Sequence, residues 1–413
     1  MESIKYLETI RLITNMGETL TKARIKAKSF IRKRMMSFSS AIEFMLDMRK
    51  TTLQTRLNIY FEQTGKGTSM SQQAFSKLRM NFDHSPFETM VRETVKEEYK
   101  NPAELPLWHG YHVFGIDGSY FQLPRSKELY DTFGIHGRPP QCPNAGISIM
   151  FDVLSGWAVD PIITDAKMNE RAECAKHIDF LCSEMPNIAK NSIFLMDRGY
   201  PSLDMFKKIQ TSGLKFVIRA RTNHLPEIDN APMGDSTFIR DGIEIRVIKL
   251  TLPNGDVEIL LTNLFELSQS LVIKLYTMRW VAETAYFKLK RELCVEKFSG
   301  RTANSVYQDF WASMVLLNAV AVFQAEADAA VALRQEGKGN KHFYNARTSD
   351  LIITLRDRFI FATLCGNPDF SSSEFELIIN TMARSVSAVR PNRSFLRIHR
   401  PFSKTCANLK SFL

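Results

Sequence analysis

Three acidic residues of the sequence stand out because of the segments that carry them. Asp117 and Asp197 each follow a short apolar run, and each is followed closely by a glycine, Gly118 and Gly199. Glu283 lies in a segment that also holds a tyrosine, an arginine and a lysine at regular spacing. Such carboxylates suit phosphodiester cleavage with two divalent ions ~4 Å apart, which activate the nucleophile and stabilise the leaving oxygen. Taken alone, each aspartate is better explained as an ordinary residue that ends a strand.

The segment around Glu283 predicts a helix with two distinct faces. At about 100° per residue, Tyr276, Glu283 and Lys290 lie along one stripe, and Arg279 lies about 60° from it. Apolar residues follow heptad-like spacing on a different face: Leu271, Leu275, Met278, Ala282, Leu289 and Leu293. One face would pack on a sheet, and the other would present a carboxylate beside two cations that can bind phosphates. A solvent-exposed helix with salt bridges has the same pattern, and the spacing does not decide between them.

The other chemically active residues predict no further site. The six cysteines are scattered without a C-x-x-C pair, which favours free thiols over a zinc site or a disulfide framework. The eight histidines form no ligand-spaced cluster. A glycine loop followed by Lys-Ser or Lys-Thr is missing, so we expect no nucleotide cofactor. Trp280 is expected to be a core residue.

The acids must be positioned by the elements that follow residue 108, whose pattern predicts an α/β fold with a mixed sheet. Three strands come first, and helices and strands then alternate. The expected strands span residues 111–116, 120–123, 145–153, 157–164, 192–196 and 215–220, with helices at 170–185 and 203–209. Alternation within residues 238–264, around Asn254-Gly255, predicts an inserted hairpin or small sheet. Long helices are expected at about 266–297 and 302–325.

Residues 1–100 predict an all-α domain in a basic chain. The net charge is +10 and the isoelectric point about 9.2, a balance that suits a polyanionic partner without proving one. Helices are expected at 40–48, 52–61 and 71–80, with a glycine-containing turn before the last. This order resembles a helix-turn-helix, in which the last helix would contact DNA through Gln72, Gln73, Lys77 and Arg79.

The C-terminal region, residues 331–413, is expected to be helical and basic. No acid follows Glu376, whereas many cations do, among them Arg384, Arg390, Arg393, Arg397, Arg400 and Lys404. Such a run is typical of a solvated surface or of a contact with the DNA backbone. Acids and bases occur throughout the first thirty residues, so we expect no signal peptide. The longest uncharged stretch, 310–325, is too short for a bilayer span, and we expect a soluble protein without a membrane partner.

Together these motifs resemble those of a known family. The pattern Tyr-x2-Arg-x3-Glu-x6-Lys, formed by Tyr276, Arg279, Glu283 and Lys290, is similar to the signature of the insertion-sequence-four family of bacterial DDE transposases. Asp117-Gly118-Ser119 and Asp197-Arg198-Gly199-Tyr200 resemble the first and second aspartate motifs of that family. The likeness covers residues 100–330, and the region between 215 and 264 corresponds to the β-strand insertion in the family's ribonuclease-H-like core.

The resemblance implies a DNA transposase that binds the terminal inverted repeats of an insertion sequence and performs metal-dependent cleavage and strand transfer (cut-and-paste transposition). Asp117, Asp197 and Glu283 would be the catalytic, metal-binding triad for Mg²⁺, for which Mn²⁺ can substitute. Tyr276, Arg279, Lys290 and Arg198 would hold DNA. In a ribonuclease-H-like sheet the first and fourth strands are neighbours, which would bring the two aspartates together.

The same resemblance implies an organisation and partners. A DNA-binding domain at 1–100 would precede a ribonuclease-H-like catalytic domain at 101–330, with its β insertion at about 215–264, and the basic region would follow at 331–413. The partners would be double-stranded DNA, as element ends and target, and a second copy of the chain in the synaptic complex. The location would be the bacterial cytoplasm, at the nucleoid.

One departure and two alternatives stay open. Family members that form a DNA hairpin place an aromatic residue, often Trp, in the insertion to stack on a flipped base. This chain has no Trp between Tyr200 and Trp280, and offers Phe216, Phe238 and Phe265. A non-catalytic DNA-binding descendant is disfavoured by the intact acidic residues. A hydrolase with paired carboxylates, such as a glycosidase, is disfavoured by the basic charge.

Overall fold

The computed structural model describes residues 2–390 except 33, 48, 50, 66, 138–140, 254 and 365–367. The chain divides into two compact units, and each of them is discontinuous in sequence. The sheet unit comprises Val95–Tyr120 and Gly146–Phe287, and the helical unit comprises Met1–Thr94, Phe121–Ala145 and Lys288–Leu413. This division differs from the expected domains at 1–100, 101–330 and 331–413. Within the helical unit, the helix after residue 302 packs with the first helix of the chain and with two helices that follow it in sequence.

The sheet unit is built on one mixed sheet with the strand order β3-β2-β1-β4-β5-β8-β7-β6. The three strands at the centre of the sheet, β1, β4 and β5, are parallel. The pairs β2–β3, β5–β8, β8–β7 and β7–β6 are antiparallel. The adjacency of β1 and β4 is therefore confirmed. The strands are β1 His112–Gln122, β2 Asn144–Asp152, β3 Ala158–Thr164, β4 Ser192–Met196, β5 Lys215–Ala220, β6 Gly234–Arg240, β7 Ile243–Thr251 and β8 Val257–Thr262.

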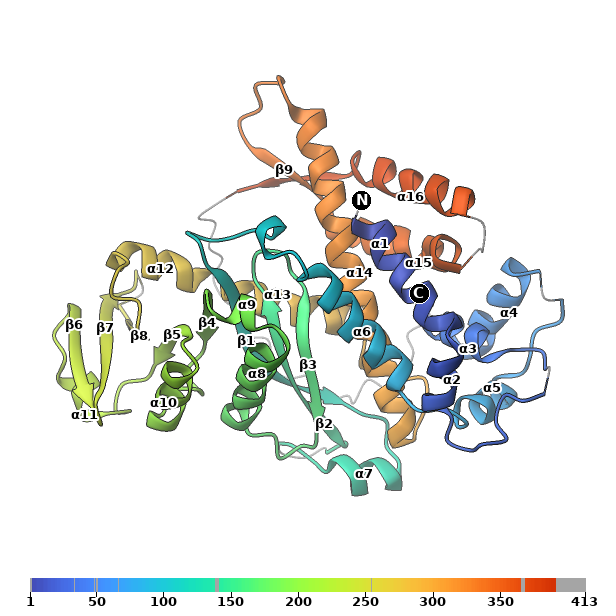
Figure 1. The fold of residues 1–413 in the computed structure, drawn as a ribbon, viewed down its shortest axis with the longest axis horizontal. Helices are drawn as coiled ribbons and strands as arrows, with labels where there is room; N and C mark the ends of the chain where they lie inside the picture. Colours follow the sequence, from blue (N-terminus) through green and yellow to red (C-terminus); the bar gives the residue numbers. More distant parts are fainter. Residues whose placement is uncertain are drawn as a thin grey trace. The chain divides into compact units, whose positions relative to one another are not determined.

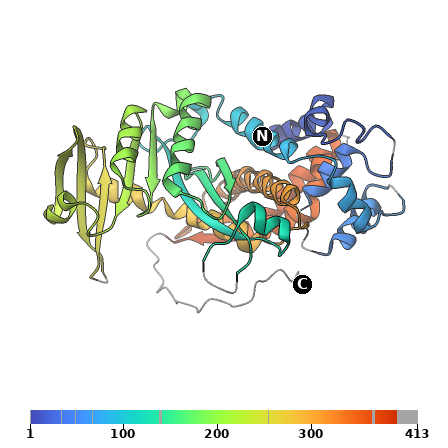
Figure 2. The same cartoon turned by 90° about the horizontal axis from the view of Figure 1, so that it is seen from below.

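The last three strands form the insertion expected between the fifth strand and the helix of Glu283. It is a small three-stranded sheet, the second of the two expected forms, because residues 234–240 also pair with β7. β8 joins the insertion to β5, so the small sheet continues the main sheet (Figure 2). The helix α11, Pro226–Asn230, precedes it.

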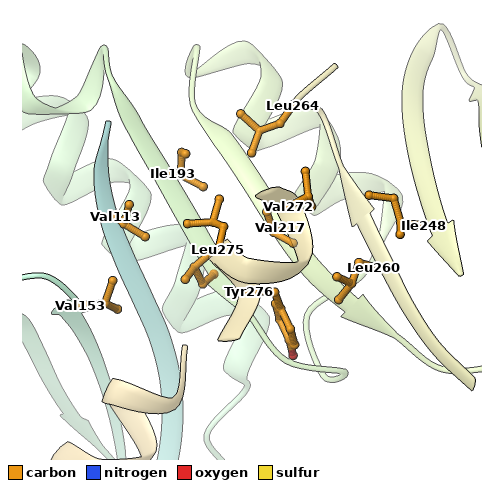
Figure 3. Packing of buried hydrophobic residues seen from close by; sticks show 11 residues of the cluster. Val113, Val153, Ile193, Val217, Ile248, Leu260, Leu264, Val272, Leu275 and Tyr276 are labelled. Atoms are coloured by element: carbon orange, nitrogen blue, oxygen red, sulfur yellow. The ribbon is translucent and has the colours of Figure 1, made fainter. Parts of the chain in front are cut away.

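Both faces of the sheet are covered because side chains alternate along β4. Ile193 and Leu195 face the helix α12, Gln269–Thr277, whose Val272 and Leu275 lie over β1, β4 and β5 (Figure 3). On the other face, Cys174 Sγ of α8 lies 3.5 Å from Met196 Sδ. The helices α8, Glu170–Glu184, and α10, Leu203–Thr211, cover that face (Figure 1).

A buried hydrogen-bond network fixes α8 on the sheet. His177 of α8 hydrogen-bonds Asp160 of β3 through Nδ1, at 2.6 Å, and Ser148 of β2 through Nε2, at 2.9 Å. The order Ser-His-Asp is that of a hydrolase triad, but Ser148 and His177 are fully buried and Asp160 is 2% exposed. No substrate could reach this serine, so the network is structural.

The helical unit contains the elements from the two ends of the chain. Its longest helix, α14, Ala303–Gln335, is long and apolar enough to cross a bilayer, but 61% of its most apolar window is buried inside the protein, where it packs with α1, α15 and α16. The other elements are α1 Glu2–Asn15, α2 Gly17–Ala23, α3 Phe38–Met45, α4 Leu53–Gln63, α5 Gln72–Arg79, most of α6 Ser85–Glu98, α7 Lys127–Phe133, β9 Phe343–Ala346, α15 Thr348–Leu364, α16 Pro368–Met382 and β10 Val386–Val389. The three helices expected at 40–80 are confirmed as α3, α4 and α5.

Two expectations about local structure were wrong. β1 does not end at Asp117 but continues to Gln122, so residues 112–122 form one strand without the expected turn. The helix expected at 266–297 is broken into α12, α13 (Trp280–Phe287) and a π-helical turn, Lys288–Glu292. Between α12 and α13 the backbone makes tighter i→i−3 hydrogen bonds, for example from Arg279 N to Tyr276 O at 3.1 Å.

Candidate active site

The pairing of β1 with β4 brings Asp117 and Asp197 to the same edge of the sheet. The parallel register ends at the pair Gly115 and Leu195, and each aspartate follows two residues later in its own segment. Asp197 comes directly after the last residue of β4, as expected. Asp117 is placed within β1, at the point where the strand has passed its partner β4. The two carboxylates therefore follow neighbouring strands and lie at the same level along the sheet.

The helix α13 brings Glu283 to this edge because it packs closely on β1. A side chain added at Gly115 would lie 3.1 Å from Val153 Cγ1, which is tighter than ordinary contact, and 3.4 Å from Ala282 Cβ, so α13 packs at contact distance over this glycine. One turn after Ala282, Tyr286 donates a hydrogen bond from its hydroxyl to the carbonyl of Asp117, at 2.9 Å. Glu283 lies between these two contacts on α13.

Tyr276, Arg279 and Glu283 lie together across the break between α12 and α13. Arg279 donates from Nη2 to Glu283 Oε1 at 2.5 Å, and its guanidinium lies 5.7 Å from the centre of the Tyr276 ring. The Tyr276 hydroxyl lies 3.5 Å from Asp197 Oδ1, at the limit of a hydrogen bond. Arg279 is 7% exposed and its Nε has no partner among the described residues.

The electrostatics of this edge are those of acids gathered around one buried cation. The pKa of Asp117 is raised to about 6, mainly by burial and less by the charges of Glu283 and Asp197, while Arg279 and the backbone N–H of Gly118 oppose the rise. Burial disfavours the charged form of Arg279, but Tyr276, Glu283 and Asp197 outweigh it and raise the pKa of the guanidinium. The three acids thus lie within electrostatic reach of one another and of Arg279.

The three acids are of the chemical type that binds divalent cations. Asp117, Asp197 and Glu283 offer only carboxylate oxygens, the ligands that Mg²⁺ and Mn²⁺ prefer, and the charges of Glu283 and Asp197 both act on the carboxyl group of Asp117. Across the described residues, no three Asp, Glu, His or Cys side chains are gathered as tightly as the ligands of a bound ion. Arg279 is the cation that pairs with Glu283 in this arrangement.

Comparison with known proteins decides the family. The family model of the transposase DDE domain matches residues 108–319, a little over half of the chain, and the matched segment contains all three acids. The chain belongs to the DDE transposase family. A structure of piggyBac transposase in a synaptic complex with hairpin DNA is similar at a TM-score of 0.44 and 13% identity, covering 94% of this chain and 84% of that one. None of the curated proteins matches the chain.

Contacts of Arg198 and Lys290 with DNA near the three acids stay predictions. Arg198 is exposed beside Asp197. Lys290 belongs to the helical unit, in the π-helical turn, where its ammonium lies 5.4 Å from the centre of the Phe121 ring. The break before α13 and the π-helical turn also change the angular spacing, so the single stripe from Tyr276 to Lys290 does not exist as expected.

The N-terminal residues expected to contact DNA differ in their surroundings. Gln72, Gln73 and Lys77 are exposed on α5. Arg79 is 3% exposed, and its guanidinium is saturated by the protein: Nε donates to Gln308, and the other nitrogens donate to Ser299, Ser305 and Asp309. We correct the expectation for Arg79 for that reason, since its position on α5 is an inner one facing α14.

The aromatic residues of the transposase also differ from expectation. Trp280 is 56% exposed, not a core residue, because the break before α13 turns it away from the sheet. Phe216 is buried and stacks on Phe206, whereas Phe265 is 44% exposed. The cations expected at 393–404 lie outside the described residues.

The sequence analysis missed one acid at this edge, Glu170, the first residue of α8. Its carboxylate lies against Gly118 and Gly199, the glycines that follow Asp117 and Asp197. Burial and then the charge of Asp197 raise the pKa of Glu170, while Arg171 and Arg221 oppose the shift. The two glycines were the available signal, but they indicated only close approach and did not say which residue approaches.

Proposed function

We propose that this transposase binds the terminal inverted repeats of an insertion sequence and cleaves and rejoins DNA there with divalent metal ions held by Asp117, Asp197 and Glu283. The observation that carries the proposal is the meeting of these three acids, from β1, β4 and α13, at one edge of the sheet. The likeness of Tyr276, Arg279, Glu283 and Lys290 to the signature of the insertion-sequence-four family supports the same assignment.

The chain's own residues divide the work as follows. Divalent ions, when bound, supply activation of the attacking hydroxyl and stabilisation of the leaving oxygen. Arg279 and Tyr276 bind a phosphate next to the scissile bond, because the guanidinium is a fork of donors suited to phosphate oxygens and the phenol is a single donor. Tyr286 holds the backbone of Asp117 in place. Arg198 and Lys290 contact the backbone further along the DNA.

The helical unit contributes a basic groove that supports DNA binding by the N-terminal region. The groove has a volume of about 1590 Å³ and is bounded by parts of residues 14–39 and 70–81. None of the described residues that line it is acidic. Five of them are cations, namely Lys26, Lys28, Arg32, Arg34 and Lys77. Neutralising phosphates with such side chains releases counterions and supplies affinity. Gln72 and Gln73, exposed on the same helix as Lys77, are the candidates for base contacts.

Two element ends must be brought together for transposition, so we propose that two copies of the chain act in the synaptic complex, on the element ends and then on target DNA. Mg²⁺ is the proposed ion, and Mn²⁺ is expected to substitute. The carbohydrate hydrolase considered from the sequence is not supported, because the chain belongs to a DNA-processing family.

A change of ligand type tests the metal assignment. In the variant Asp197→Cys, a hard carboxylate is replaced by a softer thiolate, which binds Mg²⁺ poorly and Mn²⁺ better. We expect cleavage of DNA carrying the element end to be lost with Mg²⁺ and partly restored with Mn²⁺, whereas Asp197→Ala stays inactive with both. Equal activity of Asp197→Cys and the unaltered protein with Mg²⁺ would remove Asp197 from the metal site.

A further inference from the structure

Glu170 lies between the two aspartate motifs and touches both. Its Oε1 lies 3.3 Å from the position that a side chain on Gly118 would take, and its Oε2 occupies the position that a side chain on Gly199 would take. Neither glycine has the left-handed backbone that favours glycine, so their missing side chains are explained by space. The two glycines leave room for one carboxylate beside Asp117 and Asp197.

The protein fixes the start of α8 so that Glu170 stays at this place. Asn169 caps the helix by accepting hydrogen bonds from the backbone of the following residues. Arg171 donates from Nε to the carbonyl of Gly199 at 2.9 Å, which ties α8 to the Asp197 segment. A side chain at Gly146 would collide with the backbone of Asp165 and with Met168, so the segment leading to α8 lies flat on β2.

The carboxylate of Glu170 is influenced by the charges of Arg171 and Arg221 but is not paired with either of them. Within the described part of the chain, no hydrogen bond or ion pair reaches its carboxylate, and Arg171 is turned to Gly199 instead. The side chain is half-buried and close enough to Asp197 for the two negative charges to repel. A half-buried carboxylate beside another carboxylate is unfavourable unless a cation joins them.

A buried phenol provides a separate observation at the same place. Tyr200 is 1% exposed, and its hydroxyl has no partner among the described residues. After burial and the thiol Cys174, the charges that act on its pKa are those of Glu170 and Asp117. Tyr286 is likewise influenced by both acids. The charges of Glu170 and Asp117 therefore both act on the same two buried phenols.

From this geometry we propose that Glu170 is a fourth carboxylate of the metal site and binds the divalent ions jointly with Asp117 and Asp197. The inference rests on the proposed metal-dependent function and adds one ligand to it. It also explains Gly199, where a side chain would displace the fourth carboxylate, whereas a side chain at Gly118 would crowd both Met168 and Glu170.

The test measures metal binding apart from activity. Mn²⁺ is titrated into the full-length protein, and free Mn²⁺ is followed by electron paramagnetic resonance. We expect Glu170→Gln to weaken Mn²⁺ binding by about tenfold or more, the scale of changes next to metal ligands. The matched control is Glu184→Gln at the other end of α8, where the side chain is exposed, and it should bind as the unaltered protein does.

Thermal unfolding in EDTA separates this role from a structural one. Glu170→Gln removes a half-buried charge that is repelled by Asp197, so the Tm in EDTA should stay the same or rise. A lowered Tm together with weaker Mn²⁺ binding would assign Glu170 a structural role and overturn the inference. Equal Mn²⁺ binding by Glu170→Gln and the unaltered protein would overturn it as well. If the unaltered protein binds no Mn²⁺, the proposed function itself fails, and the inference fails with it.

A double-mutant cycle tests the geometry directly. The methyl group of Gly199→Ala would collide with Oε2 of Glu170, so this variant should push the carboxylate aside and weaken Mn²⁺ binding. In a Glu170→Ala background the methyl group has room, and Gly199→Ala should cause no further loss. An equal loss in both backgrounds would show that Gly199 acts without Glu170 and would contradict the proposal.

Discussion

Replacing Arg79 distinguishes a structural arginine from a DNA contact. Its guanidinium donates to Gln308 Oε1 at 2.9 Å, Ser299 Oγ at 2.6 Å and Asp309 Oδ1 at 2.8 Å, and the residue is 3% exposed. Arg79→Met keeps the approximate length of the side chain but leaves the Asp309 carboxylate without its cation, held only by hydrogen bonds from Ser299. Removing one member of a buried ion pair costs ~3–5 kcal/mol. At about 2–4 °C per kcal/mol for a unit of this size, the Tm should fall by ~6–20 °C.

The assay is thermal unfolding with two companion variants. Lys77→Met, two residues earlier on α5 and exposed, should change stability by less than ~0.5 kcal/mol while weakening DNA binding. The double variant Arg79→Met with Asp309→Leu should regain part of the lost Tm, because an apolar pair replaces the unpaired charge. The reasoning is refuted if Arg79→Met unfolds at the unaltered Tm and loses DNA affinity as Lys77→Met does.

Three further predictions concern the groove, the packing of α13 and the core. The double variant Lys26→Gln with Lys28→Gln should lower the slope of log Kd against log salt concentration by about 2, since each lost phosphate contact contributes about 0.9. An unchanged slope would show that DNA does not bind in the groove. Gly115→Val should push α13 away from β1 and so misplace Glu283. Cleavage should slow by ~100-fold at unchanged DNA affinity, since a catalytic group misplaced by about 1 Å has that effect. Full activity would show that this contact does not position Glu283. His177→Ala should reduce the free energy of unfolding, measured with urea, by ~1–3 kcal/mol, because Ser148 and Asp160 lose their hydrogen bonds to it. If the variant lost cleavage but kept its stability, the network would not be purely structural.

The sequence predicted the sheet of this protein better than the helices that flank its site. The strands at 192–196 and 215–220 were located to the residue, because short apolar runs bounded by polar turns leave little choice of boundaries. β1 was predicted too short, since a strand that passes its partner becomes half-buried and polar and looks like a turn. The break at residue 278 was missed because the local sequence favours a continuous helix, whereas packing against two different parts of the sheet interrupts it.

Residue types identified the candidate acids, but burial decided which polar residues are available. Asp117, Asp197 and Glu283 could be named because each lies in a motif, and the pairing of β1 with β4 accounts for the first two. Arg79 and Lys77 look alike in sequence, and only the contact of α5 with α14 makes one of them an internal residue. Glu170 belongs to no motif, since its place depends on space left by two glycines far away in sequence.

The central claim is that Asp117, Asp197 and Glu283 form a metal-dependent site for DNA cleavage. The most direct measurement incubates the full-length protein with a DNA fragment that carries the inverted repeat flanking its gene, in Mg²⁺, Mn²⁺ or EDTA. We predict nicks at the boundary of the repeat with either metal and none in EDTA, and none from Glu283→Gln, although that variant still binds the DNA. Cleavage in EDTA, cleavage by Glu283→Gln at the unaltered rate, or binding without cleavage in either metal would contradict the account.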